Sequence, residues 1–314
     1  MKIFVAGATG ALGRVLVPQL VERGHEVVGM TRSKPDAVRA LGAEPVVADA
    51  LDPDAVAQAV ASAEPEAIVH QLTALGGELS ARDMRHPERS PAVIMTNRLR
   101  IEGTDHLLAA GRAVGANRFV AQSFGAFRFA RTGGPAQTEA EPLEDPPHAL
   151  EAQLAGILHL ERAVTEAGGI ALRYGGFYGP GTAISRAPDA LMAVMVRKRR
   201  FPIVGSGGGI TSHIHVDDAA AATVAAIERG APGIYNVVDD EPAPMRDWLP
   251  VLANVLGAKP PRRIPRWLGR LAAGEAATLM MTEVKGASNE KAKREFGWQL
   301  RYPSWRQGFA QGLQ

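Results

Sequence analysis

Short apolar runs alternate with longer amphipathic stretches along most of the chain. The runs are too continuous for a sheet with one face in water, which favours buried parallel strands. Between them, leucines such as Leu12, Leu16 and Leu20, and Leu99, Leu107 and Leu108 in 91–114, repeat with helical spacing. The alternation predicts an α/β fold, a Rossmann-type doubly wound parallel sheet with right-handed crossovers. Its expected strands are Ile3–Val5, Val27–Val28, Pro45–Val47, Ala67–Val69, Arg118–Val120 and Ile170–Leu172, with Ile234–Val238 returning to the sheet later.

A glycine-rich turn, GATGALG at residues 7–13, separates the first expected strand from the first expected helix. Gly7 allows the tight turn, Gly10 lets a pyrophosphate approach the backbone, and Gly13 lets the helix pack closely. The helix N-terminus then presents free N–H groups and a positive dipole end to phosphates. This context predicts dinucleotide binding, with contacts from Gly7, Thr9, Gly10, Ala11, Leu12 and Gly13.

The end of the second expected strand, VVGMTRS at 27–33, selects between the two nicotinamide dinucleotides. An NAD site offers a carboxylate to the ribose hydroxyls at this point. Here the chain has Arg32 and Ser33, followed by Lys34. A guanidinium and a hydroxyl suit a 2′-phosphate, because charge-assisted pairing is strong. We expect NADP rather than NAD, with a solvated arginine at a strand end as the alternative.

Composition narrows the kinds of partner, metal site and cellular location that we expect for this protein. The 314 residues have a net charge of +2, so the pI near 9.0 gives weak reason to expect a nucleic-acid partner. Zero cysteines exclude disulfides, thiolate metal sites and a cysteine nucleophile. His213 and His215 alternate on an expected strand but lack a third ligand with suitable spacing, so no metal is expected. Without a long apolar stretch, we expect a cytoplasmic protein with no membrane partner.

An ordered set of motifs resembles the extended short-chain dehydrogenase/reductases, the family of NAD-dependent epimerases and dehydratases. The set covers nearly the whole chain. Its members after the glycine turn are Val69-His70, Asn97 with Glu102-Gly103-Thr104, Arg118-Phe119-Val120 with Ser123, Leu172-Arg173 with Tyr178-Gly179-Pro180, and His215-Val216-Asp217-Asp218.

The resemblance implies an organisation and further cofactor contacts. Residues 1–179 would form the dinucleotide-binding domain and residues 180–314 a smaller substrate-binding lobe, with strand segments that return to the main sheet. A homodimer would form through the helices near 95–114 and 149–167. The implied contacts are Asp49 and Ala50 at the adenine, Leu72 and Thr73 on the nicotinamide side, Asn97, Gln122 at the reacting centre, and Gly176 and Phe177 at the carboxamide.

The family's Tyr-x-x-x-Lys pair is missing. In that pair, helical spacing puts both side chains on one face, and the ammonium lowers the pKa of the phenol for proton transfer. Glu161 resembles the glutamate four residues after the lysine, which places the pair at Gln153 and Ile157, and neither side chain supplies a proton. None of the four tyrosines is followed by lysine at the fourth position.

Three residues are candidates to replace the missing relay. Ser123 would hydrogen-bond a carbonyl or alcohol beside nicotinamide C4, or else bond to backbone as an ordinary strand-end serine. Tyr174 and Tyr178 flank the exit of the sixth strand, where either phenol could act as acid or as packing. We expect an NADP-dependent oxidoreductase acting on a small carbonyl or alcohol with a non-standard proton donor. The alternatives are a non-redox epimerase, isomerase or lyase with bound NADP, and a catalytically silent NADP-binding sensor or scaffold.

Overall fold

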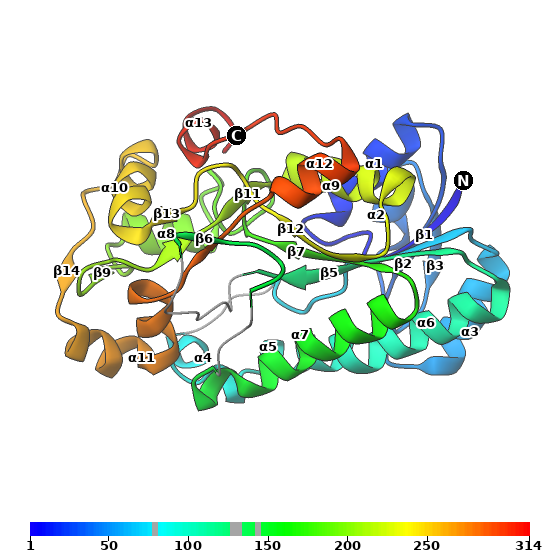
Figure 1. Ribbon diagram of the computed structural model, residues 1–314, viewed down its shortest axis with the longest axis horizontal. Coiled ribbons are helices and arrows are strands. Elements are labelled where there is room, and N and C mark those ends of the chain that lie inside the picture. Colours follow the sequence, from blue (N-terminus) through cyan, green and yellow to red (C-terminus); the bar gives the residue numbers. More distant parts are fainter. Residues whose placement is uncertain (77–80, 126–133, 142–145) are drawn as a thin grey trace.

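A seven-stranded parallel sheet runs through the middle of the molecule (Figure 1). The computed structural model describes residues 1–76, 81–125, 134–141 and 146–314. Each expected strand lies in this sheet, so the prediction of a doubly wound parallel sheet is confirmed. In spatial order the strands are β12 (Gly233–Val237), β7 (Ile170–Tyr174), β5 (Arg118–Phe124), β4 (Ala67–His70), β1 (Lys2–Ala6), β2 (Glu26–Thr31) and β3 (Glu44–Val47).

Helices cover both faces of the sheet (Figure 1). One layer, above the sheet in Figure 1, holds α1 (Gly13–Glu22), α9 (Val216–Arg229) and α12 (Glu290–Phe296), with α2 (Pro35–Arg39) at its edge. The other holds α3 (Pro53–Ala63), α5 (Pro91–Arg98), α6 (Thr104–Val114) and α7 (His148–Glu166). Leu12, Leu16 and Leu20 are all buried against the first face, as their helical spacing predicts.

The segment Pro91–Val114 differs from a single regular helix. A π-helical turn, η2 (Leu99–Gly103), joins α5 to α6. A π turn closes i→i+5 hydrogen bonds and rotates the residues that follow it around the helix axis. The leucine spacing of this segment gives no sign of the extra residue, because Leu99 at the start of the turn and Leu107 and Leu108 after it are all buried.

A second lobe lies beyond one end of the sheet and has its own core, which includes Trp248, Leu249 and Phe309. Its helices are α8 (Leu191–Arg197), α10 (Met245–Val255), α11 (Arg266–Thr282) and α13 (Trp305–Gln311). Short strands pair as β8 (Gly176–Tyr178) with β11 (His213–His215), β9 (Ile203–Val204) with β14 (Arg263–Ile264), β10 (Ile210–Thr211) with β13 (Ala243–Pro244), and β6 (Ala136–Gln137) with β15 (Gly286–Ala287). The remaining short helices are α4 (Ala81–Arg85) and the 3₁₀ turn η1 (Pro87–Arg89).

The division at residues 179 and 180 stays a prediction. Strand β12 and helices α9 and α12 follow that point in the chain and yet belong to the layers of the main sheet. Sheet contacts and sequence order therefore give different boundaries for the two parts.

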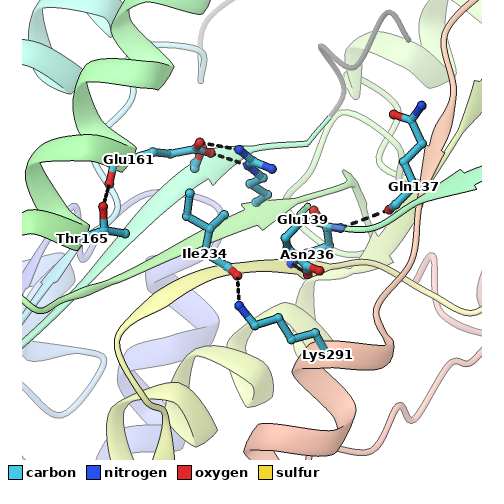
Figure 2. Close-up of polar contacts among 9 residues, drawn as sticks. Gln137, Glu139, Glu161, Thr165, Ile234, Asn236 and Lys291 are labelled. Atoms are coloured by element: carbon cyan, nitrogen blue, oxygen red, sulfur yellow. Dashed lines mark hydrogen bonds and ion pairs between the residues drawn. The ribbon is translucent and has the colours of Figure 1, made fainter. Parts of the chain in front are cut away.

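A buried ion pair fastens α7 to the sheet (Figure 2). The Glu161 carboxylate accepts hydrogen bonds from Arg173 Nε at 2.5 Å and from a terminal guanidinium nitrogen at 2.6 Å. Ser123 Oγ donates to the same carboxylate at 2.6 Å. Since Ser123 and Arg173 are paired neighbours on β5 and β7, one helix residue ties two strands together.

We expect Glu161→Gln to lower the free energy of unfolding by about 3–5 kcal/mol, because it leaves a buried guanidinium without its counter-charge. Urea denaturation followed by circular dichroism measures the loss. Glu166→Gln, the same chemical change at an exposed position of α7, is the control and should have little effect. Equal stabilities for the two variants would show that the buried pair contributes nothing.

Candidate functional site

A cavity of about 980 Å³ opens at the carboxyl edge of the sheet. The register of β1 explains its position: Ala6 lies opposite Met30 on one side and His70 on the other, so the turns after three strands meet there. All sixteen residues expected to contact the cofactor line it. They are Gly7, Thr9, Gly10, Ala11, Leu12, Gly13, Arg32, Ser33, Asp49, Ala50, Leu72, Thr73, Asn97, Gln122, Gly176 and Phe177.

The glycine turn is too tight for side chains at two of its positions. Gly7 has φ of 96°, and a Cβ on it would lie 2.8 Å from the carbonyl oxygen of Gln71. A Cβ on Gly13 would lie 2.3 Å from the carbonyl oxygen of Gly7. Any substitution at Gly13 must therefore push the turn away from α1. The closeness places the start of α1 directly at the cavity.

The start of α1 offers hydrogen-bond donors to an anion. Among the described residues, no acceptor is found for the backbone N–H groups of Ala11, Leu12 and Gly13, whereas Arg14 N donates to Gly10 O at 3.0 Å. All three residues line the cavity. Free N–H groups at a helix N-terminus, reinforced by the helix dipole, fit a pyrophosphate.

Cationic groups surround the end of β2. Arg32, Ser33 and Lys34 line the cavity and are exposed. In the part of the chain that the structure describes, Arg32 has no carboxylate partner. Asp49, the acidic lining residue expected near the adenine, accepts a hydrogen bond from Leu51 N at 3.0 Å. The N–H groups of α1 and these side chains together suit the phosphate groups of a dinucleotide.

Tyr174 lines the cavity, but its phenol is committed elsewhere. Thr223 Oγ1 donates its proton to Ala219 O at 2.7 Å, so in the 2.6 Å contact between the two hydroxyls Tyr174 is the donor. Burial raises the pKa of Tyr174 well above its usual range. A phenol that is harder to ionise and already donating is a poor acid, and the catalytic role of Tyr174 stays a prediction.

Ser123 and Tyr178, the other two candidates, are buried outside the set of described residues that line the cavity. The Ser123 hydroxyl donates to Glu161, which corresponds to the structural alternative for a strand-end serine, with a carboxylate in place of backbone as the acceptor. The Tyr178 ring packs edge-on against His215 and Phe309. Each side chain points into the protein core, and the catalytic roles of Ser123 and Tyr178 stay predictions.

The positions of the missing pair have separate environments. Gln153 is 9% exposed and lines the cavity, while Ile157 packs into an apolar cluster with Leu150 and Leu279. Between them, Gly156 allows close approach of α5, because a Cβ there would lie 3.3 Å from Asn97 Oδ1. The position expected for tyrosine therefore faces the cavity with an amide.

Sequence reasoning missed several polar lining residues, and two of these are Gln71 and Arg100. Gln71 is buried and lies close to the Tyr174 hydroxyl. Arg100, on η2, is also buried and lines the cavity. Gln71 directly follows an expected strand and Arg100 lies three residues after Asn97, so strand ends and helical spacing were the signals available. With Asn97, Gln122 and Gln153, these residues give the inner cavity an amide-rich lining.

Two classes of site are not evident in the described parts of the chain. No helix there is long and apolar enough to cross a membrane. No group of three histidine or acidic side chains there could hold a metal ion.

Three comparisons relate this geometry to known proteins. The NAD dependent epimerase/dehydratase family matches residues 3–237. A 3-diazoavenalumate denitrifying reductase of a Streptomyces species is 45% identical over 313 residues, covering 98% of this chain and 99% of its own length. A 2-alkyl-3-oxoalkanoate reductase of Stenotrophomonas maltophilia is 31% identical over 269 residues, covering 82% and 76%. The fold is shared with a Thermus thermophilus UDP-glucose 4-epimerase solved with NAD, at a TM-score of 0.72 and 23% identity over 100% of this chain and 98% of that one.

Proposed function

The chain belongs to the NAD-dependent epimerase/dehydratase family, and we propose that it is an NADPH-dependent reductase that removes a diazo group from a small substrate. It is an NAD(P)-dependent oxidoreductase, as its similarity to two named reductases over most of its length supports. The preference for NADPH and the nature of the substrate are the parts proposed.

The observation that carries the diazo substrate is the full-length similarity to a denitrifying reductase. The lining of the cavity agrees with it. The described lining includes four side-chain amides, Gln71, Asn97, Gln122 and Gln153, which donate and accept hydrogen bonds but do not release protons. The sequence has no Tyr-x-x-x-Lys pair, and the Tyr174 proton is already donated to Thr223.

A diazonium ion would be reduced without net consumption of a proton. Bound NADPH would supply a hydride, and its addition to the terminal nitrogen of an aryl diazonium ion gives a neutral diazene, Ar–N=N–H. The diazene then gives up its N–H proton, N₂ leaves as the C–N bond breaks, and the aryl carbon takes up one proton to give the arene. The balance is ArN₂⁺ + NADPH → ArH + N₂ + NADP⁺, with no net proton consumed. A carbonyl, in contrast, takes up one proton per hydride at its oxygen. In this proposal Gln71, Gln122 and Gln153 orient the substrate by hydrogen bonding.

A small carbonyl or alcohol substrate is the second candidate, and the similarity to a 2-alkyl-3-oxoalkanoate reductase favours it. In that reaction Tyr174 is the lining residue able to donate a proton. The carbonyl reaction therefore requires the Tyr174 phenol as its acid, whereas the diazonium reaction is proposed not to require it.

For the cofactor, we propose that Gly7, Gly10 and Gly13 with the N–H groups of α1 hold the pyrophosphate, and that Arg32 and Ser33 hold the 2′-phosphate. Asp49 and Ala50 would contact the adenine. Leu72, Thr73, Asn97, Gly176 and Phe177 would enclose the nicotinamide end.

A homodimer is proposed through the end of α5, α6 and α7, which lie together along one side of the molecule (Figure 1). Ile94 on α5 and Leu158 on α7 are 47% and 44% exposed, which leaves apolar surface on both helices. Burial of such side chains against a second copy is favourable.

The substrate is tested with 4-carboxybenzenediazonium and acetoacetate, each with NADPH and with protein omitted as a blank. We expect oxidation of NADPH by the diazonium with equal release of N₂, measured by mass spectrometry, and no proton uptake in weakly buffered solution. Tyr174→Phe should retain this activity, whereas a general acid would cost about 10²–10⁴-fold in rate. Turnover of acetoacetate alone, with one proton consumed per NADPH and loss in Tyr174→Phe, would establish the carbonyl candidate instead.

Cofactor preference is tested by calorimetric titration with NADPH and NADH. We expect Arg32→Gln to lower the affinity for NADPH by about 10–100-fold, the size expected for loss of one hydrogen bond to a charged group. NADH affinity should barely change. Arg39→Gln, an equal loss of charge on the exposed side of α2, is the control. Unchanged NADPH affinity in Arg32→Gln would contradict the assignment.

The dimer is tested by sedimentation velocity of the wild type and Leu158→Glu. We expect the wild type to sediment as a dimer and the variant as a monomer, because a carboxylate would be buried in the interface. Leu271→Glu, on the exposed face of α11 at 60% exposure, should leave the dimer intact. A monomeric wild type, or a dimer that only Leu271→Glu disrupts, would refute this interface.

A further inference from the structure

Arg100 is a buried charge in the wall of the cavity. Its side chain lies on the π turn η2, is 6% exposed and lines the cavity. The other charged lining residues that the structure describes are exposed: Arg14, Arg32, Lys34, Asp49 and Asp189. Arg100 therefore differs from them in having lost its water on folding.

No protein group in the described ranges hydrogen-bonds to the Arg100 guanidinium. Glu161 is close enough to attract it, but the Glu161 oxygens already accept from Arg173 and Ser123. Burial lowers the pKa of Arg100 to about 10, and this effect exceeds the attraction of Glu161. The guanidinium stays protonated at neutral pH and has unused donors.

Apart from Glu161, the polar groups near Arg100 are neutral. His70 senses the charge of Arg100, and burial lowers the pKa of His70 to about 4, so this imidazole is uncharged. Its nitrogens already contact Leu99 O and Leu72 N at 3.2 Å. Asn97 Oδ1 has no partner among the described residues, and Gln71 is a neutral amide close to the Tyr174 hydroxyl. The cavity wall thus provides polar contacts for a ligand, and no carboxylate among the described residues hydrogen-bonds to Arg100.

We infer that Arg100 binds a carboxylate of the substrate, so that the protein selects anionic over neutral molecules of the same shape. A guanidinium presents a planar pair of donors that matches a carboxylate. The anionic groups of a dinucleotide have other donors in this protein, the N–H groups of α1 for the pyrophosphate and Arg32 with Ser33 for a 2′-phosphate. The Arg100 guanidinium is therefore available to the substrate, the second molecule that binds in the cavity. This inference rests on the proposed reductase function and specifies its substrate class.

Binding without turnover tests the inference. The protein saturated with NADP⁺ is titrated calorimetrically with cinnamate and with cinnamide, its neutral analogue. We expect cinnamate to bind at least about tenfold more tightly than cinnamide, the size of one charge-assisted hydrogen bond. Arg100→Gln should remove this preference and leave the affinity for NADP⁺ unchanged. Arg112→Gln, an equal loss of charge at an exposed position of α6, should keep the preference.

Arg100→Lys guards against a variant that fails to fold. It keeps the charge but loses the paired donors, so cinnamate should bind several-fold more weakly while cinnamide is unaffected. Two results would overturn the inference: a cinnamate preference that survives in Arg100→Gln, or a loss of NADP⁺ affinity in that variant, which would assign the guanidinium to the cofactor. Because no reaction is needed, failure to reduce a diazonium would leave this experiment with a clear answer.

Discussion

The close contact between the turn after β1 and the backbone after β4 determines where everything else in the site can be. Gly7 lies against the carbonyl of Gln71, and Gly13 lies against the carbonyl of Gly7. Side chains at either position would separate α1 from the sheet and move its free N–H groups out of the cavity. The register of the parallel strands then brings the ends of β2, β4, β5 and β7 to the same edge. For this reason the N–H groups at the start of α1, the side-chain amides and the buried Arg100 guanidinium all line one cavity.

The effect of losing a proton relay depends on whether reduction of the substrate consumes a proton. An enzyme that makes an alkoxide needs an acid within reach, and Tyr174 is poorly suited to that task because its proton is held by Thr223. An already cationic acceptor of hydride consumes no net proton. The amides in the wall, including Gln153 at the position expected for tyrosine, are consistent with a site that binds and orients rather than one that exchanges protons.

The sheet and the cofactor side of the cavity were accessible from the sequence, because both depend on local patterns. Continuous apolar runs located every strand of the main sheet, and the glycine spacing located the turn at Gly7. The polar side chains of the inner cavity were harder to assign. Ser123 follows the same strand-end pattern as Gln122, yet it points to Glu161, since alternate residues of a strand face opposite sides. The position of Arg100 depends on a π turn, which the periodicity of the neighbouring leucines does not reveal.

The burial of Arg100 also determines whether the loss of its hydration opposes ligand binding or opposes folding. Dehydration of a charged group opposes binding when it must happen at the moment of association. Here folding has already dehydrated Arg100, so the cost is borne by the stability of the empty protein. An anion entering the cavity would need to shed only its own water. Because an anion would bind the folded protein and not the unfolded chain, its binding should raise the free energy of unfolding above that of the ligand-free protein.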